Sequence, residues 1–216
     1  MQLFYHFTKD IAQKLILLIN EQANSYDNLL KKANPFFRKW KGKISEASSI
    51  VENIELFPKD SSPQDVALEM ETAGAQYFDY IYGLEAIKVS RVVLCGSLIQ
   101  MARQTLSIAH RQSSPKDQPP GRSIGRQHLR DVVRHGRNHC MHFEEDQPHK
   151  HTIDFLKQLE QDFGNSFPYS KKPKESLAIE LIAILGWTSH ETYAKDIKSL
   201  LPARAAGLTG KRTSRA

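Results

Sequence analysis

The fold is decided by one long helical stretch, residues 62–110, with the sequence SPQDVALEMETAGAQYFDYIYGLEAIKVSRVVLCGSLIQMARQTLSIAH. Pro63 predicts where the helix begins, because proline is favoured at the first helical position and Asp65 follows in the first turn. Apolar residues then recur at helical spacing to the end of the stretch. Gly74 and Gly83 are the positions at which the pattern allows an interruption or a kink. Nearly every other segment also fits a helical period and none alternates as a strand, which predicts an all-α protein.

Working outward from this stretch, we expect helices on both sides of it. Pro35 separates two of them upstream, because a proline inside a helix removes a hydrogen bond and its ring clashes with the preceding turn. Downstream, residues 112–125 are rich in Pro, Gly and Ser and are predicted to form an exposed loop. The remaining predicted helices span residues 8–32, 36–54, 126–145, 151–163, 175–185 and 190–201.

These helices predict an antiparallel helical bundle with additional carboxy-terminal helices. We expect the bundle to take up residues 1–165, with residues 126–145 as its late, charged helix. Residues 166–203 are expected to form a helical extension packed on the bundle. Residues 204–216, which are basic and contain small polar residues, are predicted to be a disordered tail.

The composition is that of a folded domain in a reducing compartment. The chain has 216 residues, of which 40% are hydrophobic and 9% aromatic, and this excludes a wholly disordered chain. Cys95 and Cys140 show no paired spacing, so they are predicted to be free thiols rather than part of a disulfide scaffold. The most apolar stretch, residues 177–187, contains Glu180 and is far shorter than the ~20 residues that cross a bilayer. With no signal peptide evident, we expect a cytoplasmic protein without a membrane segment.

The formal net charge of +6 is unevenly distributed along the chain. Between Arg111 and Arg137 seven basic residues face two acids, and from Arg204 onward four basic residues face none. The rest of the chain is therefore slightly acidic. A basic cluster on an otherwise acidic body favours a polyanion partner such as a nucleic acid, although a solvated helix face produces the same pattern.

Six of the nine histidines lie within residues 128–151, where the internal basic segment ends. One explanation is a metal site, because His135, His139 and His142 fall within one narrow stripe of a helix, at a spacing that helical zinc sites use. Two neighbouring arginines would repel a cation there. We therefore expect no metal or cofactor and keep these three histidines as the alternative metal ligands.

A second explanation is RNA cleavage without a metal. A histidine can exchange a proton with the ribose 2′-hydroxyl, while an arginine holds the scissile phosphate and stabilises the transition state. The nucleophile belongs to the RNA, so these two residue types suffice for the reaction. DNA, which lacks the 2′-hydroxyl, should not be cut by this route.

The segment Arg137-Asn138-His139-Cys140-Met141-His142 resembles the motif of HEPN domains, in which an arginine and a polar residue are followed a few positions later by a histidine. Several Arg and His pairs in this chain have a similar spacing. Asn138 directly after Arg137, with small or apolar residues before His142, favours this register. Arg134 with His139 gives a second register.

This resemblance implies that Arg137 binds the phosphate, His142 acts as general acid or base, and Asn138 orients the pair or the substrate. Residues five apart on a helix point about 140° apart, so Arg137 and His142 do not converge on one helix. HEPN ribonucleases usually dimerise through this region, and a two-fold homodimer would combine both residues in one composite site. The arginines expected to bind and guide RNA are Arg122, Arg126, Arg130 and Arg134.

We therefore expect a homodimeric, metal-independent endoribonuclease that cleaves RNA by 2′-hydroxyl transesterification. The resemblance to HEPN proteins further implies a toxin or antiphage defence effector, with an antitoxin or another defence protein as partner. The alternative is a helical module that binds RNA or a partner protein without catalysis.

Overall fold

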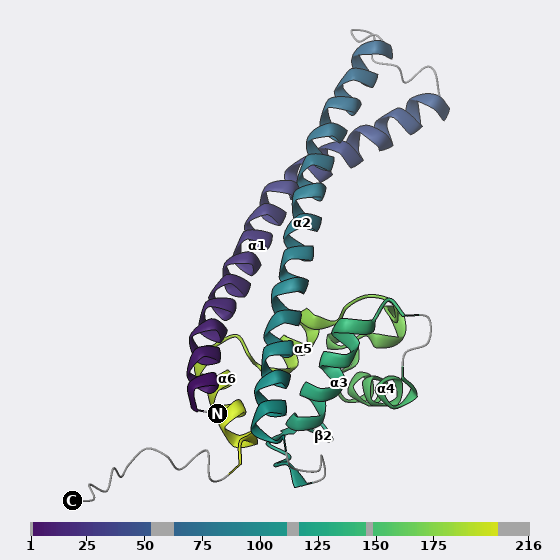
Figure 1. Ribbon diagram of the computed structural model, residues 1–216. Helices are drawn as coiled ribbons and strands as arrows, with labels where there is room; N and C mark the ends of the chain where they lie inside the picture. Colours follow the sequence, from purple (N-terminus) through teal and green to yellow (C-terminus); the bar gives the residue numbers. More distant parts are fainter. Residues whose placement is uncertain (1, 53–62, 112–116, 146–148, 203–216) are drawn as a thin grey trace, which may run out of the picture. The chain divides into compact units, whose positions relative to one another are not determined.

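The computed structural model describes residues 2–52, 63–111, 117–145 and 149–202, and confirms an all-α protein (Figure 1). Its helices are α1 (Gln2–Glu52), α2 (Pro63–Ala109), α3 (Leu129–His142), α4 (Lys150–Phe163), α5 (Ala178–Leu185) and α6 (His190–Leu200). Two 3₁₀ turns, η3 (Gly164–Ser166) and η4 (Tyr169–Lys171), follow α4. The chain forms two compact units, one of Glu21–Ser90 and one of Met1–Asn20 with Arg91–Ala216.

The predicted break at Pro35 is wrong, because α1 continues through it as one helix of 51 residues. A proline inside a helix costs about 3 kcal/mol. Aromatic contacts just beyond it hold the chain helical: the Phe36 ring stacks on Tyr80 at 5.1 Å between centroids, and Trp40 stacks on Tyr77 at 5.3 Å. Tertiary packing therefore overrides the local signal.

Within the unit Glu21–Ser90, the two long helices run antiparallel. Lys43 of α1 bridges to Glu69 of α2, with 2.7 Å between Nζ and Oε2. Gly74 and Gly83, where the sequence pattern permits an interruption, both lie within one unbroken helix α2. A Cβ at Gly74 would lie 3.1 Å from the Trp40 indole nitrogen, and α2 approaches α1 closely there because glycine has no side chain.

The other unit holds the main hydrophobic core. The last part of α2 supplies Leu98 and Ile99, and α4 and α5 both pack against α3. Helices α3 and α4 each bury the apolar face that their 3.6-residue period predicts. Trp187, just after α5, is completely buried. Cys95 and Cys140 are free and lie in this core, where burial raises the pKa of each thiol to about 12.

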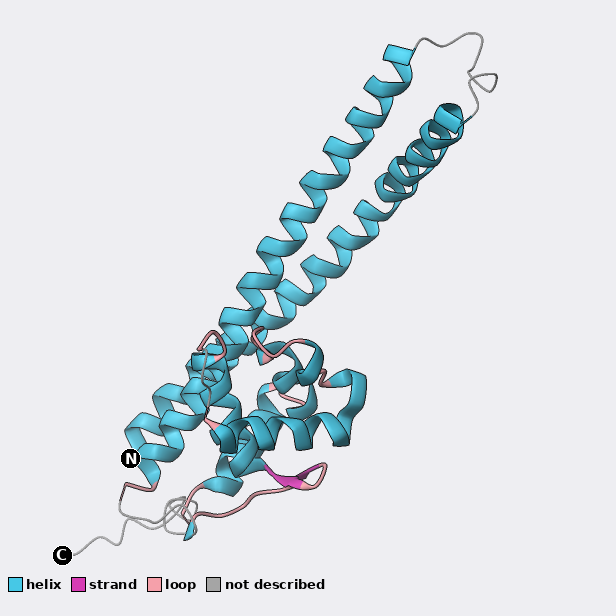
Figure 2. Cartoon of the chain, turned by 90° about the vertical axis from the view of Figure 1, so that its right-hand side faces the viewer, coloured by secondary structure: helices cyan, strands magenta, loops and turns pink. Residues whose placement is uncertain are grey.

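A short β-hairpin, which the sequence did not predict, precedes α3. Strands β1 (Ser123–Ile124) and β2 (Gln127–His128) pair antiparallel, and appear in magenta in Figure 2. Gly125 has φ +58°, as the first position of a two-residue type II′ turn requires. The hairpin moves the start of α3 to Leu129, whereas residue 126 was predicted. Residues 112–116 of the predicted loop lie outside the described residues.

The carboxy-terminal helices lie close to their predicted positions. Gly164, with φ +55°, ends α4, and Ser189 caps α6 by accepting a hydrogen bond from the Thr192 backbone nitrogen. The predicted boundary between the bundle and the carboxy-terminal extension lies at residue 165. Residues on both sides of it belong to the same compact unit, so the compact units differ from the predicted domains. The predicted tail, residues 204–216, lies outside the described residues.

Among the described helices, one is long and apolar enough to span a membrane by length and composition alone. It comprises Gln64–Ala109 of α2, and half of its most apolar window is buried inside the protein. A core helix passes the same test, so this finding assigns no location to the protein.

Candidate functional site

The rotation of α3 about its own axis is fixed by its buried face. Leu129, Val132 and Val133 are completely buried at its start. Further along, a Cβ at Gly136 would lie 3.1 Å from Leu181, so α5 packs directly against the helix backbone. Cys140 continues the buried face toward the end of α3. The motif residues between these positions are therefore held in defined directions.

Arg137 points toward α2. Its Nε donates a hydrogen bond of 2.7 Å to Oε1 of Gln100, and Nη1 lies 3.4 Å from the Asn138 side-chain oxygen. The side chain is half-buried, and no ion pair holds it within the described part of the chain. A neutral amide therefore positions its guanidinium group, and no carboxylate pairs with it in the described part of the chain.

His142 lies at the exposed end of α3 and is held by a carboxylate. Its Nδ1 is 2.5 Å from Oε1 of Glu145, and the two side chains are 45% and 53% exposed. The carboxylate favours the tautomer with hydrogen on Nδ1. Within the described residues Nε2 has no hydrogen-bond partner. It is therefore the nitrogen through which the ring can exchange a proton.

Asn138 and His142 line the same small cleft between α3 and α4, together with His149 and Ile153 of the facing segment. Arg137 instead contacts α2. The structure therefore brings Asn138 and His142 to one cleft and directs the guanidinium group of Arg137 to another side of α3, as the helical spacing predicts.

His139 serves the core. It is 5% exposed, and its Nε2 lies 3.1 Å from the Glu175 carbonyl oxygen and 3.4 Å from the Leu177 backbone nitrogen. Burial lowers its pKa, and the hydrogen bond to the Glu175 carbonyl opposes that shift only in part. In the second register, Arg134 with His139, the histidine is therefore buried, and its Nε2 is already in contact with backbone groups.

The alternative metal site is not assembled. His135 stacks on Phe155 at 4.5 Å between ring centroids, and its Nδ1 lies 3.3 Å from the Thr152 hydroxyl. Burial and then the charge of Arg134 lower the pKa of His135. Because His139 and His142 have the separate partners given above, the three rings do not converge. No group of three His, Cys, Asp or Glu side chains placed to bind a metal occurs among the residues the structure describes.

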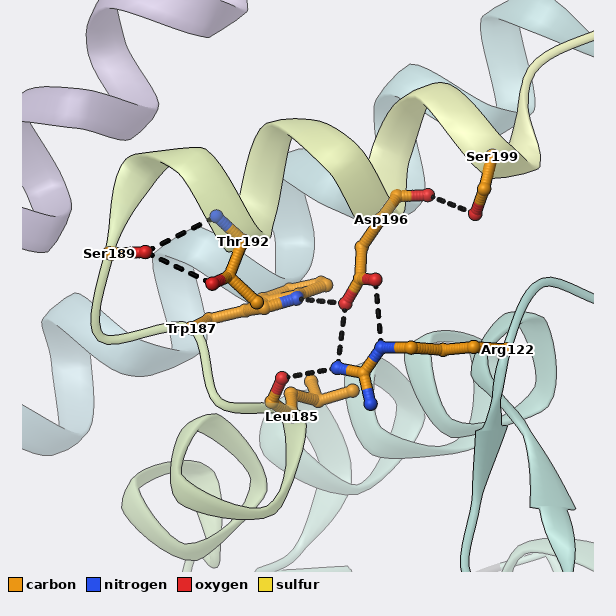
Figure 3. Close-up of polar contacts among 7 residues, drawn as sticks. All are labelled: Arg122, Leu185, Trp187, Ser189, Thr192, Asp196 and Ser199. Carbon is orange, nitrogen blue, oxygen red and sulfur yellow. Dashed lines mark hydrogen bonds and ion pairs between the residues drawn. The ribbon is translucent and has the colours of Figure 1, made fainter.

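Arg122, one of the predicted RNA-binding residues, is tied to the fold by a buried carboxylate, although its own side chain is 43% exposed (Figure 3). Its Nε and Nη2 donate to the two carboxylate oxygens of Asp196, at 2.8 and 2.9 Å, and Nη2 also donates to the Leu185 carbonyl. Asp196 is 3% exposed and accepts a further hydrogen bond from the Trp187 indole. This bidentate arrangement connects the segment before the hairpin to α5 and α6.

Arg126 and Arg130 are also paired. Arg126 lies in the hairpin turn instead of on α3, and its Nε is 2.5 Å from Oδ1 of Asp162. Arg130 pairs with Asp131 and donates 2.7 Å to the Gln118 carbonyl oxygen. The sequence predicts a helix that begins at residue 126, and this start is wrong: Arg126 does not lie on the same helix as Arg130 and Arg134.

Arg134 differs from these three. It is exposed and has no ion pair among the described residues. With Arg103 of α2 it lines a cleft that also includes Leu106, Gln118 and Arg130. Sequence reasoning missed Arg103, because nothing in its surroundings on α2 indicates that α3 lies across it.

Comparisons of the chain with models of protein families, with curated proteins and with solved structures find no match. The resemblance to HEPN domains therefore rests on the motif residues of α3 alone.

Proposed function

We propose that the chain is a metal-independent endoribonuclease of the HEPN type. The observation that carries this proposal is the pairing of His142 with Glu145 at the exposed end of α3. A ring held at Nδ1 by a carboxylate presents Nε2 as a proton acceptor, and as a proton donor once protonated. Of the two motif histidines, His142 alone has this arrangement, because His139 is buried.

In the proposed reaction, the ribose 2′-oxygen attacks the adjacent phosphorus. The bond between phosphorus and the 5′-oxygen breaks, leaving a 2′,3′-cyclic phosphate and a 5′-hydroxyl end. The 2′-hydroxyl proton passes to His142 Nε2 when the ring acts as base, and a protonated ring supplies the proton of the leaving 5′-oxygen when it acts as acid. Arg137 stabilises the charge that gathers on the phosphate.

A homodimer supports this chemistry better than one chain does. Arg137 and His142 lie on different sides of α3, so a single copy presents them to different surroundings. Two copies of α3 related by a two-fold axis would place the arginine of one beside the histidine of the other. Such a cleft would also hold two His142 rings, which would allow one to act as base and the other as acid.

The role in the cell follows from the resemblance alone. We propose a toxin or antiphage defence effector whose partner is an antitoxin or another defence protein. The Arg137 and His142 side chains are the surface that such a partner would cover.

The test is cleavage of a labelled RNA in EDTA by wild type, Arg137→Ala and His142→Ala. Each substitution should lower the rate about 10²- to 10⁴-fold, the range that general acid–base and electrostatic catalysis supply. His151→Ala is the matched control, because it removes an exposed histidine of α4. The product end should carry a cyclic phosphate. The same strand with 2′-deoxyribose throughout should stay intact.

Intact RNA after incubation with wild type would reject the enzyme, as would equal cleavage by wild type and both site variants. Tight RNA binding without cleavage would instead favour a non-catalytic RNA-binding module. A monomeric mass at the concentration at which cleavage occurs would reject the composite site.

A further inference from the structure

Arg130, Arg134 and Arg137 form one continuous stripe along α3. Residues three or four apart lie on the same helix face, and the 1.5 Å rise per residue makes the stripe about 10 Å long. Arg103 of α2 lies beside it, with Nη1 donating 2.7 Å to the Ser107 hydroxyl. This set of Arg103, Arg130, Arg134 and Arg137 is called the arginine stripe below.

The arginine stripe has very little acid to balance it. Asp131 is paired with Arg130, and no ion pair is found for Arg103, Arg134 or Arg137 in the described part of the chain. The pKa of Arg103 is lowered, first by burial and then by the charges of Arg134 and Arg137. These guanidinium groups therefore repel one another through a partly dry surface, where charges interact strongly.

A cleft opens at the middle of the stripe. It is lined by Arg103, Arg130 and Arg134, with Leu106 and Gln118 completing its walls. The Gln118 carbonyl oxygen fixes the Arg130 guanidinium by accepting a hydrogen bond. The Arg130 fork is already bonded to Asp131, whereas Arg103 and Arg134 have no carboxylate partner among the described residues. Their planar guanidinium groups suit a phosphate group, which accepts bidentate hydrogen bonds.

We propose that this cleft binds a backbone phosphate of the RNA strand next to the scissile phosphate. The inference rests on the proposed function, because Arg137 at the end of the stripe marks where the scissile phosphate lies. Arg134 is one helical turn from Arg137, so the neighbouring phosphate reaches it. The cleft thereby sets the register of the strand and requires a nucleotide on that side of the cut.

Binding is measured by fluorescence anisotropy with a labelled 2′-O-methyl oligoribonucleotide, which cannot undergo transesterification. Arg103→Ala and Arg134→Ala should each weaken binding about tenfold, as expected for the loss of a charge-assisted hydrogen bond. Each should also reduce the slope of log K against log salt by about 0.7. Lys157→Ala, which removes an exposed charge from α4, is the matched control and should stay within about twofold of wild type.

A second variant, Arg134→Lys, keeps the charge and removes the planar fork. Its affinity for the 2′-O-methyl oligoribonucleotide should lie between those of wild type and Arg134→Ala. Thermal unfolding checks that each variant is folded. The proposal is overturned if both arginine variants bind as Lys157→Ala does, or if the salt slope is unchanged.

The two proposals fail in different ways. If wild type cuts RNA but both arginine variants bind and cut normally, the cleft is not a phosphate site while the nuclease stands. If the variants lose binding but wild type cuts no RNA, the cleft is supported and the nuclease is rejected. In cleavage assays, a short substrate that lacks the phosphate expected in the cleft should have a higher KM with wild type. The KM of Arg134→Ala should be the same with and without that phosphate.

Discussion

The arginines of the basic segment fall into two groups that the sequence does not distinguish. Arg122 and Arg126 each meet a carboxylate far along the chain, Asp196 and Asp162. Arg134 meets none among the described residues, although it lies in the same segment. The first group is committed to ion pairs within the fold, whereas Arg134 has no carboxylate partner in the described part of the chain. Basic residues that form ion pairs within the fold must therefore be left out before a run of like charges is taken to indicate a nucleic-acid interface.

The largest effect is expected at the partner of Arg122. Asp196→Ala leaves the Arg122 guanidinium and the buried Trp187 indole without their acceptor. Losing these charge-assisted hydrogen bonds and leaving the buried indole N–H without an acceptor should lower the free energy of unfolding by about 2–4 kcal/mol. Urea denaturation measures it. Asp154→Ala, an exposed aspartate of α4, should change stability by less than about 0.5 kcal/mol. Equal losses in the two variants would contradict a structural role for Arg122.

The histidines show the same contrast between a buried and an exposed residue. His139→Ala removes a buried ring and its hydrogen bond to the Glu175 carbonyl, and should cost about 2 kcal/mol at pH 7. His142→Ala should leave stability nearly unchanged, because that ring is exposed.

The pH dependence sharpens this contrast. Burial lowers the pKa of His139 in the folded protein, so the unfolded chain binds its proton first as the pH falls. The contribution of the neutral His139 ring to the free energy of unfolding is complete above about pH 6.5, the ordinary pKa of histidine. It is lost as the pH drops below that value. Unfolding measured from pH 7.5 to 5 should show a weaker decline in His139→Ala than in wild type. An unchanged decline would contradict the assignment.

A smaller effect is expected for the exposed pair. Arg126→Ala should cost about 0.5–1 kcal/mol, because the Arg126 side chain is 63% exposed. The pKa of Asp162 is lowered chiefly by the hydrogen bond from the Arg126 backbone nitrogen, which the alanine variant keeps. Most of that pKa shift should therefore persist when the Asp162 carboxyl is titrated by NMR. A return to the ordinary value would show that the guanidinium group is the main cause.

The smallest effect on stability is expected at Arg134. Arg134→Ala should change the free energy of unfolding by less than about 0.5 kcal/mol, because the side chain holds nothing in the described fold. Loss of its repulsion with Arg103 should make the change neutral or slightly stabilising at low salt. A loss above 1 kcal/mol in thermal or urea unfolding would place Arg134 with the structural arginines.

Local signals predicted most of the helices. Pro63 begins α2 and Gly164 ends α4, because these residues act through their own backbone geometry. Pro35 misled the prediction, since its cost is offset by ring contacts with a helix that lies about forty residues further along. The β-hairpin was missed because strands of two residues have no period to detect.

The candidate site was predicted only in part. The motif on α3 is continuous in sequence, and its helical geometry showed that Arg137 and His142 diverge. Arg103 was missed because its neighbours belong to another helix, and Glu145 was not assigned to His142 although it lies three residues away. The partners of Arg122 lie more than sixty residues away, beyond any local pattern.

Because both cysteines are buried, the folded chain should be unreactive toward thiol reagents. With a thiol pKa of about 12, Cys95 and Cys140 carry almost no thiolate at neutral pH and should resist maleimides and air oxidation in the folded state. A cysteine introduced at the exposed position of Met141 would then be the one reactive thiol on α3. Spin labels attached there would report directly how far apart two copies of α3 lie.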